Sequence, residues 1–325
     1  MGMRIIKAGL SDSFQDMGRN GFQHLGIQPS GVMDTIAAAT ANALLGNSLS
    51  EPVLEMHFPA ATMLFETSTM ISLAGADFGA QINGIDIALH QAILVPAQTE
   101  LRFTKHHKGA RVYVAVEEGF KIEKWLGSYS TSFLVNQGGF CGRNLKKNDL
   151  IDFNNPEDLE IDTLTHLPWR ASVSEFYTNN SISFIAGSEY HLLEKISQKT
   201  ISTNPYKISK QSNRMGYRLE GQALLLSEKL ACLSSAVNFG TIQLLPNAQL
   251  IVLMADHQTT GGYPRVGHVA TTSLPSLAQA SVGDYIQFEL ETIESAEINY
   301  LQQQQNLQQL VNACNFRLQE YFKND

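Results

Sequence analysis

Short apolar runs with the length of β-strands recur along most of the chain. Helical periodicity is rare by comparison, so the pattern predicts a mainly β protein. The predicted strands cover residues 70–74, 81–89, 92–96, 100–103, 111–116, 181–186, 242–245, 250–255 and 285–290.

Turn-forming residues separate these runs at intervals of ~8 to 12 residues. Examples are Asn83-Gly84, Pro246-Asn247 and Gly283-Asp284. This spacing is typical of sandwiches or barrels and argues against repeated βαβ units.

Two segments have the pattern of helices. Residues 35–45 are rich in alanine, with Asp34 as the expected N-cap and Gly46-Asn47 as the stop. Residues 296–322 carry an apolar stripe and a polar glutamine run, which predicts a helix packed on the outside of the protein.

The length of 325 residues predicts about two domains. Residues 152–168 are acidic, rich in Asn and Pro and poorly patterned, so we interpret them as a linker. The predicted domains are residues 1–160 and 161–295, followed by a helical extension at 296–325.

Composition narrows the class of protein. The chain has 23 basic and 31 acidic residues, a formal net charge of −8, which argues against nucleic-acid binding. Its longest purely apolar stretch, residues 250–255, is far shorter than the ~18 residues of a membrane span. Cys141, Cys232 and Cys314 are too far apart and too few for a disulfide framework or a metal clip. We therefore expect a soluble, cytoplasmic protein with no membrane or nucleic-acid partner.

The densest cluster of polar residues follows the apolar run 250–254. A rigid strand end, a glycine pair and several hydrogen-bonding groups suit a ligand site, whereas a simple hairpin with glycine turns is the structural alternative. The candidate residues are Asp256, His257, Gln258, Thr259, Thr260, Gly261, Gly262 and Tyr263.

Two further segments place cations beside glycines. Arg214 and Arg218 flank Gly216, and Arg143 and Lys146 follow a Gly-rich turn. Both patterns suit a carboxylate or phosphate ligand, although surface salt bridges explain them equally well. The chain lacks the GxxxxGK[ST] spacing of a P-loop.

Other polar residues have structural explanations of similar weight. Asp16 and Arg19 suit either a site or a mutual ion pair, and Asp77 suits a turn. His106 and His107 are adjacent, so on a strand they face opposite sides and do not form a metal site.

Read together, the motifs resemble a known family. They are FQDMGR, SGVMD, GAD, LGSYST, GGxxGR, SxRMGxRL, GTIQ and, most specifically, DxQTTGGYP. This order resembles the biotin-dependent carboxyltransferase family, which contains the 5-oxoprolinase C subunit together with the allophanate hydrolase subunit 2 and urea amidolyase group. The resemblance covers roughly residues 3–292.

The resemblance implies a fold, a reaction and partners. It implies two cyclophilin-like β-barrel domains, and subunits A and B with which the chain cleaves 5-oxo-L-proline to L-glutamate. It also implies ATP hydrolysis, with ATP and Mg²⁺ shared with a partner subunit. The carboxyltransferase members imply an alternative, transfer from carboxybiotin to urea or a related amide, and a regulatory binding role is a third reading.

The family chemistry suggests roles for the candidate residues. Phosphorylating the lactam oxygen makes a poor electrophile reactive, and this step needs donors that stabilise anions. Arg214, Arg218, Arg143 and Lys146 then suit phosphate or the substrate carboxylate. The predicted catalytic group is Asp256, His257 and Gln258, and no residue is predicted as a metal ligand.

The sequence departs from the family pattern at three positions. Asn213 replaces the aspartate of SDRMG and cannot accept a proton in its place. Cys141 and Asn148 replace glycines in expected turns, and a positive φ is costlier for cysteine than for asparagine.

Overall fold

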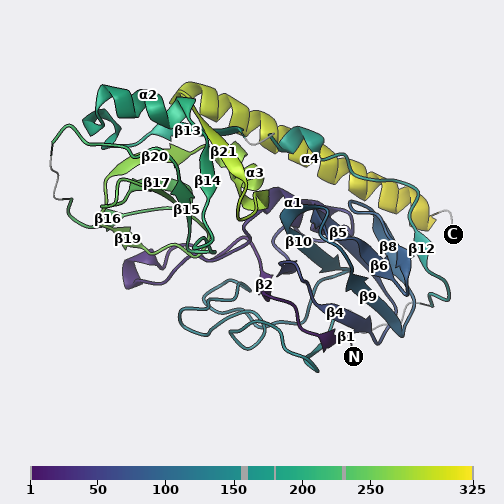
Figure 1. Cartoon of the computed structure of the whole chain (residues 1–325). Coiled ribbons are helices and arrows are strands. Elements are labelled where there is room, and N and C mark those ends of the chain that lie inside the picture. Colours follow the sequence, from purple (N-terminus) through teal and green to yellow (C-terminus); the bar gives the residue numbers. More distant parts are fainter. Residues whose placement is uncertain (1, 155–159, 179–180, 229–231, 324–325) are drawn as a thin grey trace. The chain divides into compact units, whose positions relative to one another are not determined.

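The computed structural model describes residues 2–154, 160–178, 181–228 and 232–323 (Figure 1). The chain divides into two compact units. Unit 1 contains Met1–Gly18, Asp34–Val173 and Gln305–Asp325, and unit 2 contains Arg19–Met33 and Ser174–Gln304. The domain limits expected at residues 160 and 295 stay predictions.

Unit 1 is built from two six-stranded sheets. In spatial order, the first sheet contains β11 (Leu150–Ile151), β1 (Met3–Lys7), β4 (Thr62–Phe65), β9 (Thr99–Phe103), β6 (Ala80–Ile82) and β7 (Ile85–Asp86). The second contains β12 (Thr165–His166), β8 (Ala92–Val95), β5 (Thr69–Asp77), β10 (Lys108–Val116), β3 (Val53–Met56) and β2 (Asp12–Gln15).

Both sheets of unit 1 contribute to one hydrophobic core. Phe65 of the first sheet and Phe14, Leu54, Leu73 and Val114 of the second are all completely buried in it. The alternation of side chains along each strand directs one face of each sheet to this core.

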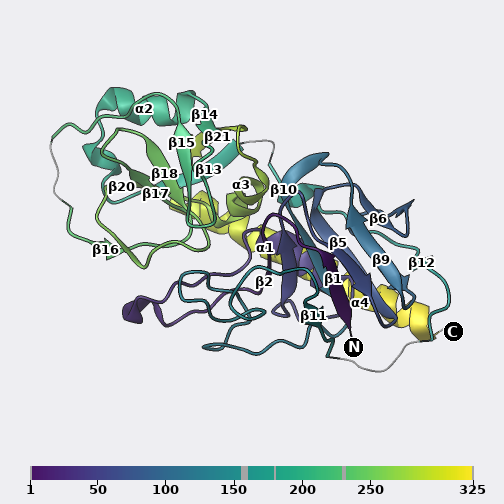
Figure 2. The same cartoon turned by 60° about the horizontal axis from the view of Figure 1, so that its bottom comes forward.

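Unit 2 contains a closed barrel (Figures 1 and 2). Antiparallel pairs make up the barrel except for β13 with β21, which is parallel. Its strands, in order, are β13 (Ser181–Ala186), β20 (Arg265–Val269), β17 (Thr241–Leu244), β18 (Leu250–Leu253), β15 (Gly216–Glu220), β14 (Tyr206–Ile208) and β21 (Tyr285–Leu290). A separate two-stranded sheet pairs β16 (Ser235–Ala236) with β19 (Thr260–Gly261).

Four α-helices and four short 3₁₀ segments accompany the strands in the described part of the chain. The α-helices are α1 (Thr35–Ala43), α2 (Lys195–Thr203), α3 (Leu274–Gln279) and α4 (Ile293–Lys323). The 3₁₀ segments are η1 (Gln23–Leu25), η2 (Ser174–Phe176), η3 (Tyr190–Leu192) and η4 (Thr271–Ser273). None of the described helices is long and apolar enough to cross a membrane.

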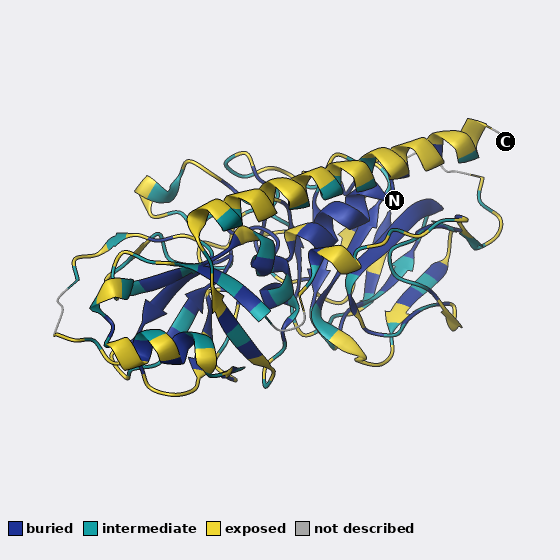
Figure 3. Cartoon of the chain, turned by 90° about the horizontal axis from the view of Figure 1, so that it is seen from above, coloured by how far each residue is buried: buried dark blue, intermediate teal, exposed yellow. Residues whose placement is uncertain are grey.

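The two predicted helices are confirmed. Asp34 is the N-cap of α1, because its carboxylate accepts the Ala37 N–H at 2.9 Å. The long helix α4 is exposed along most of its length (Figure 3), as its glutamine run indicated. In unit 1, its Cys314 is buried against Ala43 and Leu44 at the end of α1.

The mainly β class and the long strands are confirmed, with two local corrections. Residues 81–89 form not one strand but the β6–β7 hairpin, with Asn83 and Gly84 at positive φ in the turn. Part of the expected linker is structured, because β12 pairs with β8 through Thr165 and Leu94. Residues 155–159 of that linker lie outside the described residues.

Candidate functional site

The loop that follows β18 is anchored by a buried ion pair. Arg214 Nε lies 2.8 Å from Asp256 Oδ2, and Arg214 Nη2 lies 3.1 Å from Oδ1. Both side chains are less than a tenth exposed. The Asp256 N–H also donates to the Arg214 carbonyl at 2.8 Å, so backbone and side chains together join this loop to the turn before β15.

The same ion pair holds the Arg19–Met33 segment within unit 2. Arg214 Nη2 donates to the Gly31 carbonyl at 2.6 Å, and Gln28 Nε2 donates to the Asp256 carbonyl at 2.6 Å. The geometry shows Arg214 and Asp256 positioning the loop. The anion-binding role expected of Arg214 and the catalytic role expected of Asp256 stay predictions.

His257 is almost fully buried beside this ion pair. Its Nδ1 lies 2.6 Å from the Gln258 carbonyl, which favours the tautomer that carries the proton on Nδ1. Burial lowers the pKa of His257, and burial also lowers the pKa of the nearby His268. Both imidazoles are therefore neutral at pH 7.

A cavity of about 230 Å³ lies on the outer face of the barrel. Its position follows from strand register: Arg218 is paired with Ile251, and Ile251 is paired with Gln243. Directly paired residues project to the same face, and the flanking Val252 and Ile242 fill the barrel core. The three residues therefore form a row across β15, β18 and β17 on the outside.

Polar side chains from two loops complete the cavity. Gln258 and Tyr263 come from the loop after β18, and Gln211 and Asn213 come from the segment before β15. The structure thus brings together three predicted site residues, Arg218, Gln258 and Tyr263.

Gln243 is a residue of this site that the sequence analysis missed. It is 1% exposed, and its Nε2 has no hydrogen-bond partner among the described residues. A Cβ at Gly261 would lie only 2.5 Å from this Nε2, so glycine at that position makes room for the amide. The sequence feature that could have identified Gln243 is a glutamine inside an apolar strand, within the GTIQ motif.

Asn213, which replaces the family aspartate, shapes the turn that leads into β15. Its Oδ1 accepts the Met215 N–H at 2.8 Å, and its backbone exchanges hydrogen bonds with Gly216. A carboxylate oxygen accepts the same bond, so the substitution preserves the turn while removing a charge.

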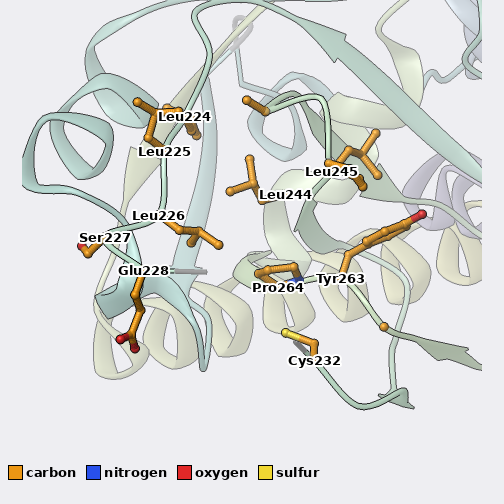
Figure 4. Close-up of a pocket in the computed structure, with 13 residues that line it drawn as sticks. Leu224, Leu225, Leu226, Ser227, Glu228, Cys232, Leu244, Leu245, Tyr263 and Pro264 are labelled. Carbon is orange, nitrogen blue, oxygen red and sulfur yellow. The ribbon is translucent and has the colours of Figure 1, made fainter. Parts of the chain in front are cut away.

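A larger cavity of about 690 Å³ shares Leu245 and Tyr263 with the smaller one (Figure 4). Leucine side chains line much of it. Gly262, which directly follows β19, and Cys232, which precedes β16, also line it. Burial raises the pKa of the Cys232 thiol, which disfavours the reactive thiolate.

The remaining residues of the loop have structural roles in this small sheet. Thr260 and Gly261 form β19, and the Thr259 carbonyl accepts the Val237 N–H at 3.3 Å. These three residues thus contribute backbone pairing to the small sheet, and the ligand-binding role expected of them stays a prediction. Gln258 and Tyr263 line the cavity.

Arg143 and Lys146 belong to unit 1 and are not part of this cavity. Arg143 donates to both carboxylate oxygens of Asp149, at 2.7 and 2.9 Å, and the Lys146 N–H donates to Asp149 at 2.7 Å. Arg143 therefore takes part in an ion pair, and the anion-binding role expected of Arg143 and Lys146 stays a prediction. Cys141 in the same turn has φ +56°, the positive value that the sequence analysis identified as costly.

Asp16 organises a loop of unit 1. Its carboxylate accepts the hydroxyls of Ser128 and Ser130, each at 2.6 Å, and the N–H groups of Tyr129 at 2.6 Å and Gly18 at 2.8 Å. These contacts link the FQDMGR and LGSYST motifs and give Asp16 a structural role.

Comparison with known proteins shows the family. Residues 25–290 match the family model described as "Carboxyltransferase domain, subdomain A and B". The chain is 34% identical to the 5-oxoprolinase C subunit of Escherichia coli, over 95% of the chain and 97% of that protein. It is 32% identical to the 5-oxoprolinase C subunit of Haemophilus influenzae, over 87% and 89% respectively.

A solved structure has the same fold. The structure of the K. lactis urea amidolyase superposes with a TM-score of 0.86 at 26% identity, covering 95% of this chain and 20% of that much longer one. The fold that contains the barrel is thus that of a carboxyltransferase-type protein. The chain belongs to the carboxyltransferase domain family whose members include the 5-oxoprolinase C subunit.

Proposed function

We propose that the chain is the C subunit of an ATP-dependent 5-oxoprolinase, which converts 5-oxo-L-proline to L-glutamate together with subunits A and B. One observation carries this proposal: the two relatives with that name match over 97% and 89% of their own lengths. The chain thus matches most of the length of these C subunits, whereas it corresponds to 20% of the urea amidolyase.

The reaction opens the lactam ring. Water adds to the ring carbonyl carbon, the C–N bond breaks and the nitrogen takes a proton, which gives L-glutamate. ATP bound with a partner subunit would supply the activation of the ring carbonyl. For this chain we assign binding and orientation. Gln258 and Tyr263 offer polar groups at the cavity, and the Arg214–Asp256 pair holds their loop in place.

The described residues do not fit a complete Mg²⁺–ATP site in this cavity. Mg²⁺ in nucleotide sites takes one or two carboxylates plus phosphate oxygens. None of the described residues lining the cavity is Asp or Glu, and the described chain contains no cluster of three His, Cys, Asp or Glu residues suited to a metal. We therefore assign no residue of this cavity to the nucleotide, and we propose that ATP and Mg²⁺ are shared with a partner subunit.

Carboxyl transfer from biotin is the second candidate function. The likeness to urea amidolyase favours it, because the urea amidolyase fold covers 95% of this chain. Urea and the ring of 5-oxoproline are both small planar amides, so one cavity suits either acceptor. The two functions differ in what they consume: ATP with 5-oxoproline, or carboxybiotin with an amide.

ATP hydrolysis by the purified complex tests the proposal. The chain is combined with its A and B partners, and phosphate release is measured with and without 5-oxoproline, then again with the chain left out. We expect stimulation by 5-oxoproline that requires the chain. Gln258→Ala in the cavity is expected to lower it, and Gln304→Ala on the exposed surface of α4 serves as the matched control. Equal stimulation without the chain, or none with all three subunits, contradicts the proposal.

A further inference from the structure

The outer cavity of the barrel has an unusual set of polar groups. One cation, Arg218, faces it together with the amides of Gln211, Asn213, Gln243 and Gln258. None of the lining residues that the structure describes carries a carboxylate, and the Arg218 side chain makes no ion pair in the described part of the chain. The charge available to a ligand is therefore positive.

The buried amide of Gln243 adds an independent reason to expect a ligand. A buried donor without a partner costs ~1–3 kcal/mol, and native proteins retain few such groups. Gln243 is 1% exposed at the wall of the cavity, and its Nε2 has no partner among the described residues. A carbonyl oxygen in the cavity satisfies this donor.

The register of the strands sets the separation between the two groups. Gln243 and Arg218 lie on either side of Ile251, two strand spacings apart, so their backbones are about 10 Å apart. The apolar Ile251 side chain lies between them. A cavity of about 230 Å³ holds roughly eight waters at ~30 Å³ each, which is room for a five-membered ring and its substituents.

We propose that this cavity binds a small molecule that carries a carboxylate beside a ring amide. Arg218 pairs with the carboxylate, Gln243 donates to the amide carbonyl, and the ring packs on Ile251. The inference rests on the proposed function, which supplies 5-oxoproline as the ligand. Arg218 and Gln243 are the residues that distinguish 5-oxoproline from related molecules.

Titration calorimetry with the full chain tests the assignment through three probes. 5-Oxoproline has both polar groups, proline lacks the ring carbonyl, and 2-pyrrolidinone lacks the carboxylate. Gln243→Met is expected to weaken 5-oxoproline binding about ten-fold or more without changing proline binding. Arg218→Met is expected to weaken 5-oxoproline binding similarly without changing 2-pyrrolidinone binding.

Two controls separate loss of the site from loss of the fold. Arg218 is exposed, so its substitution leaves the core intact, and Arg317→Met on exposed α4 is its matched control. Gln304→Met is the control for Gln243→Met, whose folding is checked by its melting temperature. Unchanged affinity in both cavity variants overturns the assignment.

Kinetics of the assembled complex distinguish this inference from the proposed function. If the complex hydrolyses 5-oxoproline while both cavity variants keep the parent KM, the cavity assignment fails and the function stands. If the complex is inactive on 5-oxoproline but the chain binds it through Arg218 and Gln243, the function fails and the cavity assignment stands. Absence of binding by the chain together with an unchanged KM overturns the assignment.

Discussion

Asp256→Ala is expected to destabilise the barrel as well as to change its site. The substitution removes two hydrogen bonds from the Arg214 guanidinium and deprives a buried cation of its carboxylate. It also loosens the loop on which Gln258 and Tyr263 are mounted. A loss of activity in this variant therefore does not by itself assign Asp256 to catalysis.

The magnitude follows from burial. The side chains of Arg214 and Asp256 are 9% and 8% exposed, so solvent screens the pair poorly. Removing one partner of a buried pair costs about 3–5 kcal/mol, a large part of the ~5–15 kcal/mol that stabilises a typical domain. The double variant Arg214→Met with Asp256→Leu leaves no buried charge, and we expect it to recover most of this loss.

Tryptophan fluorescence reports on unit 1, because both tryptophans, Trp125 and Trp169, lie there. Hydrogen exchange is therefore the suitable assay for the barrel of unit 2. Mass spectrometry of peptides from β15 and β18 measures the free energy of opening in the barrel directly. We expect a loss of about 3–5 kcal/mol in Asp256→Ala and partial recovery in the double variant. A loss below ~1 kcal/mol, the range of exposed ion pairs, refutes the reasoning.

Three further substitutions test local features. Cys141→Gly relieves the φ of +56° and is expected to raise the free energy of unfolding by ~1 kcal/mol in urea titration, and no gain argues against strain there. Burial raises the pKa of Asp12 from 3.8 to about 7, so its ionised form weakens the fold as the pH rises through that range. Asp12→Asn is thus expected to stabilise the protein at pH 8 and not at pH 4, and an equal effect at both values contradicts this cause. Gly261→Ala places a Cβ 2.5 Å from Gln243 Nε2, the end of a flexible side chain, and is expected to cost about 1 kcal/mol by thermal unfolding, the low end for overpacking. Gly262→Ala, whose nearest contact is 3.3 Å, is the control, and equal losses in the two variants exclude the contact with Gln243 as the cause.

The sequence was sufficient for elements whose pattern is apolar and regular. Residues 181–186 and 285–290 form strands with those limits, and α1 begins at its predicted cap. Strand β2 was not predicted, because Asp12, Ser13 and Gln15 are polar and nevertheless buried. Their burial depends on contacts with distant segments, such as that of Gln15 with Thr131, which local pattern does not encode.

The site was predictable as a set of motifs but not as a geometry. The DxQTTGGYP loop and Arg218 were identified, and both contribute to the cavity. Gln243 was missed because only the register of β15, β18 and β17 brings it into line with Arg218. Likewise, the sequence placed Arg214 and Asp256 in separate motifs, whereas the fold pairs them across 42 positions of the chain.

The most direct test of the central claim is the product formed by the reconstituted complex. The chain and its A and B partners are incubated with ATP and isotopically labelled 5-oxoproline, and NMR follows the appearance of labelled glutamate. We predict glutamate formation that stops when this chain is omitted. Intact 5-oxoproline in the complete mixture, with carboxybiotin and urea consumed in a parallel reaction, contradicts the account.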